Sequence, residues 1–175
     1  MACHSIQAMK LPLVLACAAL ALVSAGCGSH SLPPQQIPGV SEQLVTPAAL
    51  ARYPASSPQH ALLDWWRSAQ FADPVAFLAA FTPPVRSRLA HRPAFGEELD
   101  YFAGSIRNAA PRILTTEIDG SRARIFTKIA YRTPIGTMHF VIYSRPQAFE
   151  LVRHGDRWLL ADDTLVASAL RQRNP

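Results

Sequence analysis

At 175 residues, the chain has the length of a single domain, and its apolar content of 49 % is enough for a packed core. The net charge of +5 comes from scattered basic residues, without the basic stripe and interleaved aromatics of a nucleic-acid-binding surface, so we expect no nucleic-acid partner. The three cysteines are Cys3, Cys17 and Cys27. The chain after Cys27 therefore has no disulfide, thiolate metal ligand or cysteine nucleophile.

The N-terminus has the pattern of an export signal. Residues 11–23 are uncharged and mostly apolar, follow Lys10, and are too few to span a bilayer comfortably. The sequence Ser-Ala-Gly-Cys at 24–27 comes directly after them. We expect residues 1–26 to be a signal peptide that is removed from the mature protein.

This end resembles the signal of bacterial lipoproteins, in which small residues precede a cysteine that is acylated after cleavage. Ala25, Gly26 and Cys27 fit that pattern, whereas Ser24 stands where an aliphatic residue is usual. The resemblance implies lipid attachment at Cys27 and anchoring in the bacterial cell envelope. Ordinary signal-peptidase cleavage after Ala25, with Cys27 incidental, is the alternative.

Residues 27–57 are rich in proline, serine and glutamine, a composition typical of extended, weakly packed chain. We interpret this segment as a tether between a lipid anchor and a folded domain at 58–175. Within it, residues 47–53 could form a short helical turn against the domain.

Three helices are predicted after the tether. Ser57-Pro58 is a helix start signal, and the apolar residues of 59–71 recur at helical spacing. Asp73-Pro74 repeats the signal for a short helix that we expect to stop at Thr82-Pro83-Pro84. A third helix is predicted over 93–109, with Phe95, Leu99, Phe102 and Ile106 on one face and Pro111 as its stop.

The last third of the chain predicts strands. Residues 113–118 form the first, and Asp119-Gly120 is a turn dipeptide. Residues 123–131 alternate, so that Ala123, Ile125, Thr127, Ile129 and Tyr131 share one face. Further strands are predicted at 138–144, 149–153 and 157–161, the last two joined by a tight turn at 154–156. Asp163 is expected to cap a final helix that continues to Leu170.

Helices followed by a meander of strands predict an α+β domain with its helices on one face of a mostly antiparallel sheet. This order, with the closing sequence Phe149-x-Leu151 and Gly155-Asp156-Arg157-Trp158, resembles the nuclear transport factor two-like superfamily, which includes SnoaL-like cyclases. The resemblance implies a cone-shaped, curved antiparallel sheet packed against about three N-terminal helices. Many envelope proteins with this resemblance have no known activity.

In catalytic members of that superfamily, an Asp or His works with a Tyr inside the cone. No position of this chain matches such a motif, so no catalytic residue is assigned. The residue types that could transfer protons are Asp64, His91, Asp100, Tyr101, Tyr131, His139 and Asp162. Trp66, Phe102 and Tyr131 are the residues that we expect to line a pocket, although core packing is the simpler role for the aromatics.

The sequence predicts neither a metal site nor a cofactor. His60 and Asp64 lie four residues apart on a helix, but two ligands are too few for a metal. The chain also lacks a glycine-rich phosphate loop and a nucleophile elbow.

Two functions remain open at this stage. The first is a non-enzymatic envelope lipoprotein that binds a small apolar ligand or a protein partner near the membrane. The alternative is a small isomerase, cyclase or dehydratase acting on an apolar substrate in the cone. Convergent Asp, His and Tyr side chains in the pocket would favour the enzyme. The superfamily resemblance also leaves a homodimer open.

Overall fold

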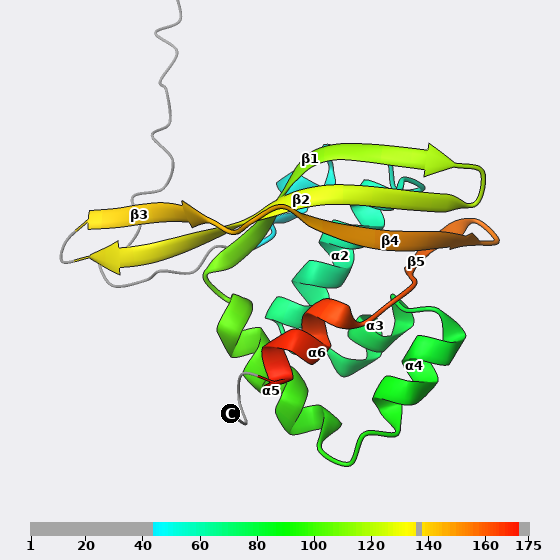
Figure 1. The fold of residues 1–175 in the computed structure, drawn as a ribbon, viewed down its shortest axis with the longest axis horizontal. Coiled ribbons are helices and arrows are strands. Elements are labelled where there is room, and N and C mark those ends of the chain that lie inside the picture. The colour runs from blue at the N-terminus through cyan, green and yellow to red at the C-terminus, as the bar shows by residue number, and fades with distance from the viewer. Residues whose placement is uncertain (1–43, 136–137, 172–175) are drawn as a thin grey trace, which may run out of the picture. The chain divides into compact units, whose positions relative to one another are not determined.

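The computed structural model describes residues 44–135 and 138–171. The predicted signal peptide, Cys27 and most of the tether lie outside these residues. The α+β class is confirmed, because helices and a five-stranded antiparallel sheet that is not closed pack on each other (Figure 1). The helices are α1 (Pro47–Leu50), α2 (Pro58–Gln70), α3 (Pro74–Ala79), α4 (Pro83–Ala90), α5 (Phe95–Ile106) and α6 (Thr164–Arg171). The strands are β1 (Ala109–Asp119), β2 (Arg122–Ile135), β3 (Met138–Tyr143), β4 (Gln147–His154) and β5 (Arg157–Leu160).

The predicted starts of α2 and α3 are confirmed. The Ser57 hydroxyl accepts a hydrogen bond from the backbone N–H of His60, and the Asp73 carboxylate accepts from the second and third residues of α3. Each cap precedes a proline at the first helical position, where a missing N–H has no cost. The predicted stop of α3 at Thr82-Pro83-Pro84 was wrong, because α3 already ends at Ala79 and residues 80–82 bond to Leu160 of β5. Pro83 instead begins a further helix, α4.

The boundary between α5 and β1 also differs from the prediction. The helix ends at Ile106 instead of 109, and Ala109 is already in β1 and fully buried. Pro111 lies within the strand, which is tolerated because β1 is at the edge of the sheet and a missing donor leaves no neighbour unpaired.

Strand β2 is the long central element of the sheet. It pairs with β1 along one edge, while β4 pairs with Arg122–Thr127 and β3 with Ala130–Ile135 along the other. The predicted alternation is confirmed, since Ala123, Ile125, Thr127 and Ile129 are all buried on the helix-facing side. The turns at Gly120 and Gly155 have positive φ angles of 54° and 64°, a conformation that glycine adopts without steric cost.

The core lies between the sheet and the helices beneath it in Figure 1. Trp65 is its centre and contacts the rings of Trp66, Phe77, Phe81, Phe102 and Phe149 at centroid distances of 5.8–6.3 Å. Val45 and Leu50 are buried in the same core. The packed domain therefore includes α1, which lies before residue 58 in the segment interpreted as tether.

Candidate functional site

A cavity of about 260 Å³ lies between the helix-facing side of the sheet and helices α2, α5 and α6. Trp66 from α2, Phe102 from α5 and Tyr131 from β2, the residues expected to line a pocket, are all in its wall. The rest of the lining is Tyr101, Ser105, Ile106, Gln147, Leu165, Ser168 and Ala169. Most of these residues are aromatic or aliphatic, but about half of the surface that faces the cavity is polar.

Buried hydrogen bonds hold the α2 side of this cavity. The indole N–H of Trp66 donates to the carbonyl oxygen of Ala109 at 2.9 Å. The side-chain amide of Gln70, one turn along α2, donates to the same oxygen at 2.8 Å and to that of Ile106 at 3.1 Å, while its own oxygen accepts from Val45 at 2.9 Å. Trp66 therefore has a fixed orientation, and the junction from α5 to β1 is attached to α2.

Tyr131 supplies a polar group at the cavity wall. Its side chain is half-buried, and this burial raises the pKa of its phenol above the ordinary value of 10.0. Loss of water disfavours the phenolate, so the hydroxyl stays protonated at neutral pH. It can donate or accept a hydrogen bond, but it is a poor general base.

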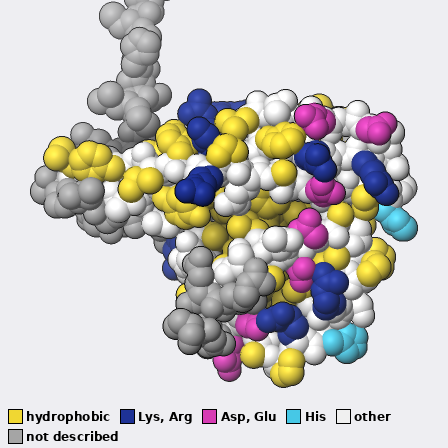
Figure 2. Space-filling model, viewed as in Figure 1, with side chains coloured by type: hydrophobic (Ala, Val, Ile, Leu, Met, Phe, Trp, Pro, Cys, Tyr) yellow, Lys and Arg dark blue, Asp and Glu magenta, His cyan; other side chains and the backbone are white. Residues whose placement is uncertain are grey.

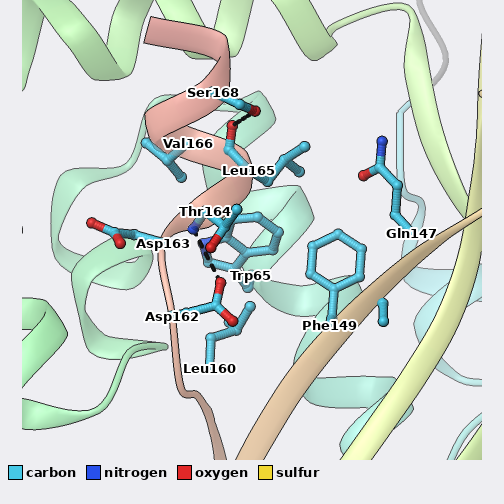
Figure 3. Close-up of a pocket in the computed structure, with 11 residues that line it drawn as sticks. Trp65, Gln147, Phe149, Leu160, Asp162, Asp163, Thr164, Leu165, Val166 and Ser168 are labelled. Atoms are coloured by element: carbon cyan, nitrogen blue, oxygen red, sulfur yellow. Dashed lines mark hydrogen bonds between the residues drawn. The ribbon is translucent and has the colours of Figure 1, made fainter. Parts of the chain in front are cut away.

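A second cavity, of about 200 Å³, lies beside the first and shares Gln147, Leu165 and Ser168 with it. Figure 3 shows the indole of Trp65 at the back of this cavity, next to the ring of Phe149 and behind the start of α6. The Trp65 side chain is buried, and its N–H has no hydrogen-bond partner among the described residues. A buried donor without a partner is costly.

The two carboxylates at this second cavity are already engaged. Asp162 accepts a hydrogen bond from the backbone N–H of Thr164 at 3.0 Å (Figure 3), and Asp163 forms an ion pair with Arg88 at 2.8 Å. Asp163 is at the predicted N-cap position of α6, because it directly precedes Thr164 and its carbonyl oxygen accepts a hydrogen bond from the backbone N–H of Ala167 at 2.9 Å. Its side chain does not cap the helix but pairs with Arg88 of α4, and the carboxylate that bonds to the first residue of α6 is that of Asp162.

Of the remaining proton-transfer candidates whose side chains the structure describes, Tyr101 alone lines either cavity. Asp64 and Asp100 are exposed on helices, and His91 is exposed at the C-cap of α4, with a ring nitrogen 2.7 Å from the Ser87 carbonyl oxygen. Tyr101 lines the larger cavity beside Tyr131. His139 lies in β3, and its side chain is outside the described part of the chain.

Among the described residues, no group of three or more His, Cys, Asp and Glu side chains could hold a metal ion. The larger cavity has no carboxylate or imidazole among its described lining residues. The described lining combines hydrogen-bonding groups with aromatic and aliphatic side chains and includes no charged side chain, so it suits recognition of a neutral molecule.

Sequence reasoning missed Trp65, Gln147, Leu165 and Ser168 as lining residues. Leu165 and Ser168 are brought to the site by α6, which folds back against α5 from the end of the chain. Gln147 is the first residue of β4, opposite Thr127 of β2. The polar Gln147 on the otherwise buried side of β4 was the one local signal that could have indicated it.

No family model matches the chain, and no curated protein matches it either. Three solved structures show limited similarity. A SEC-C motif containing protein from Rhodopseudomonas palustris has 16 % identity and a TM-score of 0.44, with 65 % of this chain and 82 % of that one covered. A protein of unknown function from Mycobacterium tuberculosis has 16 % identity and a TM-score of 0.40 over the same shares. A dehydratase candidate of the NTF2-like family from Streptomyces avermitilis has 14 % identity and a TM-score of 0.39, over 66 % and 93 %.

In the described part of the chain, no helix is both long enough and apolar enough to cross a membrane.

Proposed function

We propose that this chain is an exported, lipid-anchored envelope protein whose domain binds a small, largely apolar molecule that carries a hydrogen-bond acceptor. The supporting observation is the pair of adjoining cavities, which offer aromatic walls, the hydroxyl of Tyr131 and the unpartnered N–H of Trp65. A cavity of about 150 Å³ lined by apolar side chains is enough to bind benzene. The larger cavity here exceeds that volume at about 260 Å³.

Binding is better supported than proton-transfer catalysis. An isomerase, cyclase or dehydratase needs an acid or base within hydrogen-bond reach of its substrate. The described lining of the larger cavity offers two phenols and no carboxylate or imidazole, and burial raises the pKa of Tyr131. In the smaller cavity, Asp162 and Asp163 already bond to Thr164 and Arg88.

A fluorescent apolar probe tests the binding proposal. N-phenyl-1-naphthylamine should bind the mature protein with a large rise in emission. Ala169→Phe adds a ring to the wall of the larger cavity and should weaken binding at least tenfold. Ala167→Phe is the matched control, because it lies on the same helix and does not line either cavity. Equal affinities of the two variants would exclude this cavity as the binding site.

The lipid anchor is tested separately, by the intact mass of mature protein from its native host. We expect a chain that begins at Cys27 and carries a diacylglyceryl group, which a Cys27→Ala variant lacks. A chain that begins at Gly26 without lipid would instead establish a freely secreted protein, and the proposal of a membrane-anchored protein would fail.

A further inference from the structure

The second half of β2 and the whole of β3 form a two-stranded arm that extends away from the helices (Figure 1). We name Ala130–Ile135 together with Met138–Tyr143 the β2–β3 arm. β1 pairs with β2 only as far as Tyr131, so the residues beyond it have β3 as their sole partner strand in the described sheet. An isolated two-stranded hairpin is only marginally stable in water, which raises the question of what covers this one.

The base of the arm is firmly attached to the domain. The Arg132 N–H donates to the Asn108 carbonyl oxygen at 2.8 Å, and the Asn108 side-chain amide donates back to the Arg132 carbonyl oxygen at 3.1 Å. At the other strand, Ser144 exchanges hydrogen bonds with the backbone of Ile129. The arm is therefore a fixed projection, and its direction is set by the sheet.

Both faces of β3 expose large apolar side chains. Met138, Phe140 and Ile142 share the face of Tyr131, whereas Val141 and Tyr143 share the opposite face, because paired residues of adjacent strands point the same way. These five side chains are between 42 % and 62 % exposed. Figure 2 shows hydrophobic side chains along the face of the arm that is turned to the viewer. A protein groove would cover one face, whereas a hydrocarbon environment covers both.

The charges around the arm are all of one sign. Residues 127–147 contain Lys128, Arg132 and Arg145 and no Asp or Glu, and residues 133–143 contain no Lys, Arg, Asp or Glu. Arg112, Lys128 and Arg132 share one face at the base of the arm, as the register shows. Arg112 also donates to the Tyr143 hydroxyl at 3.2 Å. An uncharged apolar end above a cationic base with a tyrosine suits the boundary between acyl chains and anionic headgroups.

We propose that the β2–β3 arm inserts shallowly into the surface of an anionic lipid bilayer. The basic side chains at its base contact the headgroups, and the side chains of β3 enter the outer acyl region. A depth of about 5–10 Å leaves the open edges of the hairpin in reach of water and headgroups, as unpaired backbone groups require. A second copy of the chain is a less suitable partner, because the arm has no acidic side chain that could form ion pairs with the basic side chains of the other copy.

The test uses the chain from residue 27 onward with Cys27→Ala, which keeps every described element and has no acyl anchor. Flotation with vesicles of phosphatidylglycerol and phosphatidylethanolamine should recover the protein, and vesicles of phosphatidylcholine should bind it at least tenfold more weakly. The double variant Phe140→Thr/Ile142→Thr should lose binding at least tenfold. Leu114→Thr/Ile118→Thr is the matched control, since it removes two exposed apolar side chains from β1 of the same sheet.

A second readout does not depend on the double variant folding correctly. A Met138→Cys form labelled with nitrobenzoxadiazole should show a blue-shifted, stronger emission on anionic vesicles, while the label at Ile118→Cys should not respond. Absence of vesicle binding by the unlabelled protein would overturn the proposal, as would equal binding by both double variants. The arm would instead be the interface with a second copy if the protein did not bind vesicles, sedimented as a dimer, and became monomeric only in the Phe140→Thr/Ile142→Thr variant.

Discussion

Replacing Gln70 with leucine tests how the wall of the cavity is held. The Gln70 side chain is about as large as leucine and is 1 % exposed, so the change removes hydrogen bonds with little change in volume. It deletes at least three of them, those with Val45, Ile106 and Ala109. At about 1 kcal/mol each, the loss is about 3 kcal/mol. The Ala109 oxygen keeps its bond from Trp66, but the buried N–H of Val45 loses its side-chain acceptor.

Urea unfolding of the mature protein measures this effect. We expect Gln70→Leu to lower the free energy of unfolding by at least about 2 kcal/mol, because the better burial of leucine offsets only about 1 kcal/mol of the loss. Gln59→Leu, on the same helix and only half-buried, should change it by less than about 0.5 kcal/mol. If both variants lost the same small amount, Gln70 would not fasten α2 to the junction of α5 and β1.

Three further predictions concern stability. Trp158→Ala should cost about 3–5 kcal/mol in urea unfolding, because Trp158 is buried and its N–H donates to Ser56; a loss under about 1 kcal/mol would contradict its place in the core. Gly155→Ala should cost about 1 kcal/mol, since alanine is strained at the φ of 64°, and an unchanged midpoint would contradict that turn. Burial raises the pKa of Tyr131 in the folded state, so ionisation of its phenol favours unfolding. The stability linked to the protonated phenol is fully present below pH 10 and is lost as the pH rises through the folded-state pKa. Melting temperatures from pH 9 to 11 should therefore fall more steeply for wild type than for Tyr131→Phe; parallel curves would contradict this.

Local signals in the sequence were sufficient for most elements of the fold. Ser57 and Asp73 cap helices through their own side chains, and Gly120 and Gly155 turn the chain because of their own conformational freedom. Such features depend on a few adjacent residues, so they can be predicted without knowing the rest of the structure.

The predictions were wrong where contacts between residues far apart in the sequence determine the boundary of an element or the lining of a cavity. Proline can stop a helix or begin one, and Pro83, which was predicted as a stop, begins α4, whereas α3 ends at Ala79 and the chain then bonds to β5. The end of α5 depends on Trp66 and Gln70, which bind the Ala109 carbonyl oxygen from far away in the sequence. For the site, Trp66, Phe102 and Tyr131 were predicted as aromatic residues of three separate apolar segments, and the structure places all three in the wall of the larger cavity. The contribution of α6 depends on its packing against α5, which no local pattern of the sequence indicates.

Native mass spectrometry of mature protein from its own host tests the binding proposal most directly. We expect a small molecule that stays with the folded protein, is released on denaturation, and is absent from the Ala169→Phe variant but present in Ala167→Phe. The binding proposal would be contradicted if the folded protein had only the mass of its polypeptide and any covalent lipid, and also bound no apolar probe.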